Sequence, residues 1–455
     1  MSATLTPAEN RRLANTELGL LVLAIIVVLV AYALMGLHQE PQLPAGFAVY
    51  SAVLLGIAAV AHAVTRWRVR GADPLLLPLA FLLNGLGLVM VRRIDFANAG
   101  EADYTNLAPA QAVWSIVALA AFVATLLLLR DHTFLDAYRY VIGLGAVALL
   151  LLPLLPVIGT EVNGARLWVR AAGLTFQPGE LAKLGLVVFF ASYLGDKREL
   201  LSVASSRVGP FMVPPARAFA PVAAAWGVSL AVLIFEKDLG LSLLFFGIFV
   251  VMLYVSTARV AYVVAGTLLF SVGAVLAYLA FGHVRQRIAI WLDMWAYIDE
   301  PGGSFQLVQS LFALGTGGIA GVGLGDGMPT FIPFVSTDFI FSAFGEELGL
   351  LGTTALLLCY FLLVARGYRT ALRCADDFGT LLAAGLTTLF ALQVFVILGG
   401  VTRLIPLTGL TLPFISYGGS SLLANYILIA VLLRISAPAS KTAAGAAQQQ
   451  KVGRR

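Results

Sequence analysis

Residues 18–36 read LGLLVLAIIVVLVAYALMG, an uncharged apolar run of the length that crosses a bilayer. One helical crossing needs roughly 20 apolar residues. Such runs recur almost to the C-terminus of this chain of 455 residues, which is 60% hydrophobic and only 12% charged. Ordinary soluble domains carry roughly 25% charged residues, so the apolar excess is expected to face lipid. The sequence therefore predicts an all-α polytopic membrane protein.

The apolar runs predict about twelve transmembrane helices. Their approximate ranges are 18–36, 45–65, 74–91, 111–129, 140–159, 181–195, 218–235, 239–255, 260–281, 340–365, 379–401 and 419–434. Twelve crossings put both termini on one side of the membrane. If that side is the cytoplasm, about 20 Lys and Arg residues fall in inner loops and tails and about 8 in outer loops, as the positive-inside rule requires.

Three parts of the chain are distinguished by composition. Residues 1–159 form N-terminal membrane helices that are nearly free of polar residues up to about position 130, which favours packing or partner contact over catalysis. Residues 160–435 form a core with a large extracytoplasmic loop at 282–339, whose aromatic and apolar content favours an ordered structure. Residues 436–455 are rich in Ala, Gln, Lys and Arg, and we expect a disordered basic cytoplasmic tail.

Several function classes lose support at this stage. The formal charge of +5 comes from Lys and Arg in short loops, where they report orientation, so nucleic-acid binding is set aside. Cys359 lies in an apolar run and Cys374 in a basic loop, so neither predicts a disulfide framework or a CxxC metal site. The sequence contains no HExxH, SxxK or P-loop motif. Protease, transpeptidase and ATPase functions are therefore not indicated.

Glu180 and Lys183 are ionisable residues at the start of an apolar helix, just inside its outer boundary. Pro178 is placed to begin that helix, which puts the two side chains on one face at i,i+3. They are expected to pair within the membrane. Such a pair is either a structural ion pair or part of a polar cavity that opens to the outer leaflet.

Asp338 ends the long outer loop immediately before another apolar helix. Thr337 or Asp338 could be the N-cap of that helix, since Asp is a preferred capping residue. On residue type alone the cap is favoured, but a carboxylate beside a cavity at the membrane surface is also a candidate general base. Glu347 follows within the helix, where it could complement the helix dipole or face a substrate.

The segment 402–421 interrupts the hydrophobic pattern with Pro, Gly, Thr and Ser near membrane depth. Irregular backbone at that depth is tolerated only against protein or a water-filled cavity. Arg403 could bind a phosphate there through its planar fork, or it could be a surface snorkelling residue. The glycine run 315–327 follows no strand, so a dinucleotide site is rejected in favour of a flexible re-entrant or loop element.

These segments together closely resemble the SEDS family (shape, elongation, division and sporulation), and within it the RodA-like proteins more than the FtsW-like ones. The resemblance covers about residues 160–435. Its six motifs are Asn163-Gly164-Ala165-Arg166-Leu167-Trp168, Gln177 to Lys183, Asp238-Leu239-Gly240, Gln306-Leu307-Val308-Gln309-Ser310, Thr337-Asp338-Phe339-Ile340-Phe341 with Gly345-Glu346-Glu347-Leu348-Gly349, and Pro406 to Ser421.

The resemblance implies an activity and a setting. Family members polymerise peptidoglycan by glycosyl transfer from lipid II, an undecaprenyl-pyrophosphate-linked disaccharide-pentapeptide, and work with a class B penicillin-binding protein that crosslinks the strands. The protein is then expected in the bacterial cytoplasmic (inner) membrane with its active site on the extracytoplasmic face. The family core has ten helices, which leaves two extra helices near the N-terminus.

The resemblance also implies roles for single residues. Asp338 matches the essential outer-loop carboxylate, and Glu180 and Lys183 match residues that line the central cavity. The remaining substrate-binding candidates are Arg166, Arg403, Glu347, Thr337 and Ser416. Positive charge for the departing pyrophosphate would come from Arg403, Lys183, Arg166 or a divalent cation, Mg²⁺ or Mn²⁺, and no organic cofactor is expected.

The chain departs from the family pattern at a few positions that bear on substrate positioning. Relatives usually carry His where this chain has Ser336, and Ser where it has Gly179. The usual Gln-Pro before Asp238 is Glu236-Lys237.

Two other functions compete with polymerisation. A lipid II flippase also suits polar groups inside a helix bundle, but it predicts polar residues through both leaflets. Here the polar residues cluster on the outer side, which favours the transferase. A pure scaffold of an elongation or division complex would leave Asp338 dispensable.

Overall fold

The computed structural model describes residues 6–39, 47–100, 104–155, 158–162, 165–171, 174–202, 206–208, 211–213 and 238–438, with a few isolated positions between 224 and 234. The long helices are α1 (Pro7–Gln39), α2 (Phe47–Arg68), α3 (Leu76–Ala97), α4 (Ala108–Leu128), α6 (Arg139–Leu151), α7 (Pro178–Asp196), α10 (Leu239–Thr257), α11 (Val260–Ala280), α14 (Ile340–Arg373), α15 (Asp377–Val401) and α16 (Gly419–Ser436). Shorter ones are α5 (Thr133–Ala137), α8 (Arg198–Ser202), α12 (Gly282–Leu292) and α13 (Phe305–Gly317).

Nine of the described helices are long and apolar enough to span a membrane: α1 to α4, α10, α11 and α14 to α16. The protein is therefore a multi-pass membrane protein. The apolar helix at 139–154 is shorter than these nine, and α7 carries the Glu180–Lys183 pair. The predicted crossing at 218–235 lies mostly outside the described residues, as does most of the predicted tail.

The predicted C-terminal end of the crossing at 140–159 is wrong. The apolar run 140–159 forms α6 only to Leu151 and continues as a 3₁₀ turn at Leu152–Leu154. Pro153 has no backbone N–H, so it cannot continue the α-helical hydrogen bonding. A strand begins soon afterwards at Gly159, and hydrophobicity alone did not reveal this stop.

The connection between α6 and α7 contains a small antiparallel sheet. Strands β1 (Gly159–Val162), β2 (Ala165–Ala171) and β3 (Leu174–Phe176) pair in that order. A second pair, β4 (Ser206–Val208) and β5 (Phe211–Val213), follows α8. The prediction of an all-α protein was therefore too simple. Strand edges are compatible with these positions because both sheets belong to connections between the spans, where water can satisfy the backbone.

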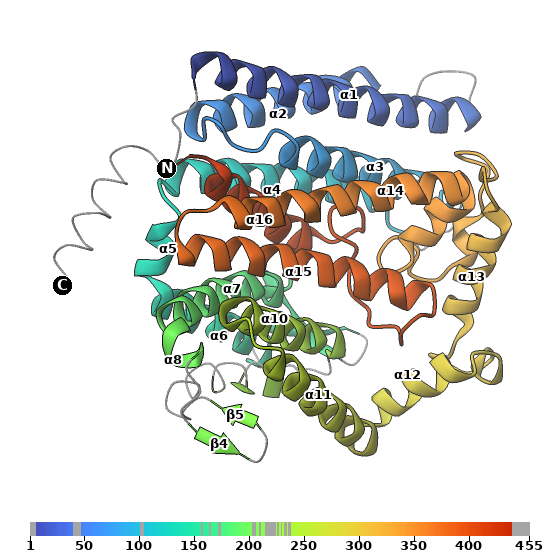
Figure 1. The fold of residues 1–455 in the computed structure, drawn as a ribbon. Helices are drawn as coiled ribbons and strands as arrows, with labels where there is room; N and C mark the ends of the chain where they lie inside the picture. The colour runs from blue at the N-terminus through green and yellow to red at the C-terminus, as the bar shows by residue number, and fades with distance from the viewer. Residues whose placement is uncertain are drawn as a thin grey trace.

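The helices run between two ends of one bundle (Figure 1). At one end, the Asp73 backbone N–H donates to Ser436 Oγ at 3.1 Å, and Arg434 Nη1 donates to the Arg68 carbonyl at 3.0 Å. Glu17 of α1 is buried there against Arg66 of α2. We call this the Ser436 end, and the opposite end, with residues 98–100, 104–107, 282–339 and 402–418, the Asp338 end. The start of α1 and the end of α16 therefore share one end.

The long loop at 282–339 is ordered, as predicted. It contains α12, a 3₁₀ turn at Trp295–Tyr297, α13 and a second 3₁₀ turn at Pro329–Phe331. The glycine run is not a free loop. Val322 N donates to the Glu346 carbonyl at 2.9 Å, and Leu350 N donates to the Gly318 carbonyl at 2.9 Å.

This pairing is possible because α14 is broken at Gly349, which has φ 64° and ψ −164°. A residue with a side chain is disfavoured at such a φ, and a Cβ there would lie 2.3 Å from the Gly321 nitrogen. The break exposes backbone groups of α14 to the glycine run, which satisfies them. The start of α14 is thereby fixed behind the segment that carries Asp338.

Candidate functional site

Asp338 lies in a tight turn directly before α14. The Thr337 N–H donates to the Phe334 carbonyl at 3.1 Å, and Phe334 has φ 56°. The N-cap position of α14 belongs to Phe339, and no side chain caps the helix. Thr337 instead donates its hydroxyl to the Phe334 carbonyl at 3.1 Å. The capping role considered for Thr337 and Asp338 is therefore wrong, and the Asp338 carboxylate is left for another use.

The surroundings of Asp338 tune its proton affinity. Burial raises the pKa of Asp338 to about 6, while the Thr337 side chain and the Arg287 charge lower it and the Asp238 charge raises it. A carboxylate with a pKa near the working pH is suited to general-base catalysis, because it is deprotonated yet still basic. Asp338 is half-buried, so it remains accessible.

Asp238 and Arg287 complete this electrostatic group, and neither was a candidate from sequence. Asp238 is the N-cap of α10, and its Oδ1 accepts from the Leu241 N–H at 3.0 Å. Burial raises the pKa of Asp238, and Arg287 opposes this shift. Arg287 projects from α12 and donates Nη1 to the Leu407 and Thr408 carbonyls at 3.2 and 3.0 Å. The Asp-Leu-Gly motif was a signal for Asp238; nothing in the sequence singled out Arg287.

Glu180 and Lys183 form the predicted i,i+3 pair on α7, with Nζ and Oε2 2.7 Å apart. Both are buried, at 2% and 1% exposure. Lys183 Nζ also donates to Gln393 Oε1 at 2.7 Å, and Gln393 Nε2 donates to the Thr411 carbonyl at 3.0 Å. This chain of contacts connects the centre of the bundle to the segment 402–418. The pair is thus a structural element here, and its contact with substrate stays a prediction.

The segment 402–418 holds the Asp338 turn by hydrogen bonds. Ser416 Oγ donates to the Thr337 carbonyl at 2.5 Å and accepts from the Leu412 N–H at 2.9 Å. The Tyr417 N–H donates to the Ser336 carbonyl at 2.8 Å. The hydroxyl of Ser416 is therefore used in positioning, and its predicted contact with substrate stays a prediction.

Gly409 brings the same segment next to the carboxylate itself. It has φ 76°, and a Cβ at this position would lie 3.7 Å from Asp338 Oδ2. A glycine both allows this backbone conformation and leaves the carboxylate uncovered.

The arginine candidates have different surroundings. Arg403 donates Nε and Nη2 to the carbonyls of Trp291 and Leu292 at 2.9 and 2.7 Å, and its own carbonyl accepts from Trp291 Nε1 at 3.1 Å. It thus ties α12 to segment 402–418. Arg166 is exposed on β2. For both, a contact with phosphate stays a prediction.

Glu347 is enclosed at the Asp338 end by a residue from the N-terminal half. Its Oε1 lies 2.9 Å from Arg93 Nε of α3, and its Oε2 accepts from the Gly325 N–H at 3.0 Å. Arg93 Nη2 donates to the carbonyls of Gly325 and Gly327, both at 2.7 Å. With Glu347 1% exposed, this pair fixes the glycine run. The N-terminal half thus contributes a buried ion pair that holds the glycine run in place.

The comparisons with known proteins agree with this architecture. The model of the FtsW/RodA/SpoVE family, described as cell cycle protein, matches residues 74–441. The chain belongs to this family. The match begins well before residue 160, so the family core includes α3, α4 and α6 as well as the region that carries the motifs.

Curated relatives of the FtsW/RodA/SpoVE family cover nearly the whole chain. A peptidoglycan glycosyltransferase RodA of Mycobacterium tuberculosis is 46% identical over 437 residues, which cover 95% of this chain and 92% of the relative. The corresponding protein of Mycobacterium leprae is 45% identical and covers 94% and 91%. A probable peptidoglycan glycosyltransferase FtsW of Geobacter metallireducens is 36% identical and covers 80% and 94%.

Solved structures of the family have the same fold. A peptidoglycan synthase complex, described as coordinating polymerization and crosslinking, contains a chain with TM-score 0.63 and 28% identity, covering 80% of this chain and 97% of that one. The rod shape determining protein RodA of Thermus thermophilus gives a TM-score of 0.54 at 27% identity, with 80% and 96% covered.

Proposed function

We propose that this chain polymerises peptidoglycan by transferring glycan from lipid II to a growing strand, with Asp338 as the general base. The chain is a glycosyltransferase by its family and by relatives that share 46% of its residues over 95% of its length. The role of Asp338 is supported by one observation above others. It is a half-buried carboxylate whose pKa is about 6 and which is not used to cap α14.

The chemistry assigned to Asp338 is proton removal. The carboxylate takes the proton from the acceptor sugar 4-hydroxyl while that oxygen attacks the anomeric carbon of the donor. The bond from the anomeric carbon to the pyrophosphate breaks, and the polyprenyl pyrophosphate leaves with the electron pair. General-base assistance of this kind contributes about 10² to 10⁴-fold.

Arg287 is the cation whose charge acts on Asp338 in the described structure. It favours the deprotonated form of the base, and the Leu407 and Thr408 carbonyls hold it in place. Lys183 is paired with Glu180 inside the bundle. Arg403 and Arg166 remain proposed partners of the pyrophosphate.

A divalent cation would be held by one or two carboxylates together with the substrate phosphates. Among the described residues, Asp338, Asp238 and Glu180 do not gather their carboxylate oxygens into a group within 4.8 Å of one another. They therefore do not form a three-ligand protein site. Mg²⁺ is commonly held by one or two carboxylates together with substrate phosphates. We propose this arrangement for Mg²⁺ or Mn²⁺ here.

The orientation follows from charge and topology. We propose twelve crossings. The described helices make eleven passes between the two ends, yet the start of α1 and the end of α16 share one end. An even number of passes is needed for that, so one further pass is required. The Ser436 end carries Arg366, Arg369 and Arg373 and faces the cytoplasm by the positive-inside rule. The Asp338 end then faces outward from the bacterial inner membrane, where the lipid II headgroup is polymerised.

A partner and a process complete the proposal. We propose that a class B penicillin-binding protein crosslinks the strands made here, in line with the synthase complex among the similar structures. The role is cell-wall elongation, since the relatives named RodA share 46% of residues and a relative named FtsW shares 36%.

Polymerisation of labelled lipid II by the purified protein with its partner tests the base. Wild type is compared with Asp338→Asn and with Glu300→Gln, which removes an exposed acid of the same loop. We expect glycan chains from wild type and Glu300→Gln and none from Asp338→Asn. Equal polymer from all three would remove Asp338 as the base. No polymer from any, with the partner bound, would lead to a lipid II translocation assay in vesicles.

A further inference from the structure

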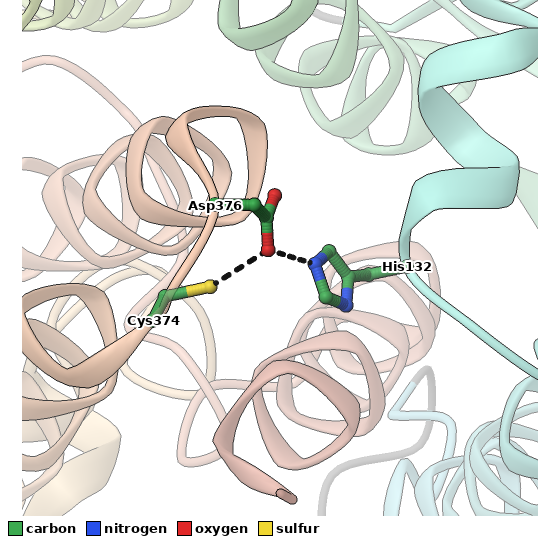
Figure 2. A group of neighbouring side chains, drawn as sticks. All are labelled: His132, Cys374 and Asp376. Atoms are coloured by element: carbon green, nitrogen blue, oxygen red, sulfur yellow. Dashed lines mark hydrogen bonds and ion pairs between the residues drawn. The ribbon is translucent and has the colours of Figure 1, made fainter. Parts of the chain in front are cut away.

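Three side chains with metal-binding atoms point toward one another (Figure 2). They lie at the Ser436 end, opposite the proposed active site. His132 lies between α4 and α5, and Cys374 and Asp376 lie in the connection between α14 and α15. His132 Nε2 is 2.8 Å from Asp376 Oδ2, and Cys374 Sγ is 3.2 Å from the same oxygen. Within the described part of the chain, this is the group of His, Cys and acidic residues whose ligand atoms all lie within 4.8 Å of one another.

The ligand atoms are oriented by contacts outside the group. Asp376 is the N-cap of α15, and its Oδ1 accepts from the Gly379 N–H at 2.7 Å, which leaves Oδ2 turned toward His132. His132 Nδ1 lies 3.2 Å from Asp131 Oδ1. A carboxylate on one ring nitrogen fixes the tautomer that presents the other nitrogen to a metal. Metal-ligating histidines almost always have such a partner.

A glycine lets the three donors converge. A Cβ on Gly379 would lie 2.5 Å from Cys374 Sγ, 2.7 Å from His132 Nε2 and 3.0 Å from Asp376 Oδ2. Any residue with a side chain at this position would therefore push the donor atoms apart. Gly379 thus allows a thiol, an imidazole and a carboxylate to come together beside the start of α15.

We propose that His132 Nε2, Cys374 Sγ and Asp376 Oδ2 bind a zinc ion, with water as the fourth ligand. A thiolate, an imidazole and a carboxylate are the donors that Zn²⁺ takes in tetrahedral sites, whereas Mg²⁺ and Ca²⁺ prefer oxygen alone. Binding requires the thiol and the imidazole to lose their protons to solvent. The ion would join the α4–α5 connection to the α14–α15 turn at the cytoplasmic end.

Metal content of the purified full-length protein tests the site. The protein, with any affinity tag removed, is loaded with Zn²⁺, dialysed and measured by inductively coupled plasma mass spectrometry. We expect about one zinc per wild-type chain, and at least about tenfold weaker binding in Cys374→Ser. Cobalt substitution should give a thiolate-to-Co²⁺ absorption band that Cys374→Ser removes. Cys359→Ser, which changes the other cysteine, should keep both.

Two further variants keep all three ligands and separate the site from the fold. Gly379→Ala places a methyl group against all three donor atoms and should abolish the retained zinc. Asp131→Asn removes the negative charge beside His132 Nδ1, while the amide oxygen can still accept from the Thr133 N–H, and it should weaken binding by about 10 to 100-fold, the usual effect of losing an outer-shell partner. Zinc at trace level in wild type, or equal binding by wild type, Cys374→Ser and Gly379→Ala, would overturn the proposal and leave a hydrogen-bonded network.

Discussion

The two carboxylates that flank the start of α14 have opposite surroundings. Glu347 is enclosed, paired with Arg93 and bonded to the Gly325 N–H. Asp338 is half-buried and caps no helix, and the charge of Arg287 lowers its pKa without a direct ion pair among the described residues. A carboxylate that is paired with a buried counter-ion contributes to the fold, whereas one that is left without a direct ion pair can take part in chemistry.

The largest loss of activity is expected from a variant of the proposed base. Asp338→Asn should reduce polymerisation by about 10² to 10⁴-fold, because the amide cannot accept the proton of the attacking hydroxyl. Its melting temperature should stay within the scatter of wild type, since no helix cap is lost. Glycan yield and thermal unfolding in detergent measure the two effects. A large drop in melting temperature together with lost activity would make Asp338 a structural residue.

Glu347→Gln should lower the melting temperature strongly, whereas Asp338→Asn should not. It leaves the Arg93 guanidinium buried without its counter-ion, which typically costs about 3–5 kcal/mol. Glu346→Gln is the matched control, because Glu346 is a neighbouring buried acid whose Oε2 has no hydrogen-bond partner among the described residues. Thermal unfolding of Glu347→Gln and Glu346→Gln measures the difference in stability. Similar melting temperatures for the two variants would contradict the structural role of the pair between Arg93 and Glu347.

The rate of polymerisation should depend on pH through the protonation of Asp338. With the pKa of Asp338 at about 6, polymerisation should fall as the pH drops through 6, because the base becomes protonated. Arg287 lowers that pKa, so Arg287→Gln should move the acidic limb to higher pH and reduce activity more at pH 6 than at pH 8. Initial rates across this range measure the shift. An unchanged limb in the variant would remove Arg287 from the electrostatics of the base.

The smallest effect is expected at Ser416. Ser416→Ala removes the hydroxyl that joins the Leu412 N–H to the Thr337 carbonyl. Loss of buried hydrogen bonds of this kind costs about 1–3 kcal/mol. We expect a several-fold lower rate with a modest decrease in melting temperature, and Ser416→Thr should recover part of both. A rate as low as that of Asp338→Asn would give Ser416 a direct role in the reaction.

The hydrophobic pattern predicted most of the spans because crossing a bilayer requires about 20 apolar residues in a helix, wherever the chain goes next. The pairing of Glu180 with Lys183 was equally predictable, since i,i+3 residues share a helix face whatever surrounds them. The stop of α6, the strands β1 to β3 and the break at Gly349 were not, because each depends on backbone partners from other segments.

By itself, the sequence determined a multi-pass membrane protein and its family, and it singled out Asp338 as a candidate base, because composition, span length and ordered motifs are local properties of the chain. Only the tertiary structure decided what each polar residue does. It paired Arg93 with Glu347, placed Arg287 by Asp338 and brought His132 to Cys374 and Asp376. The partners in these contacts come from segments far apart in the chain, and the balance between burial and compensating charge is set only once they meet.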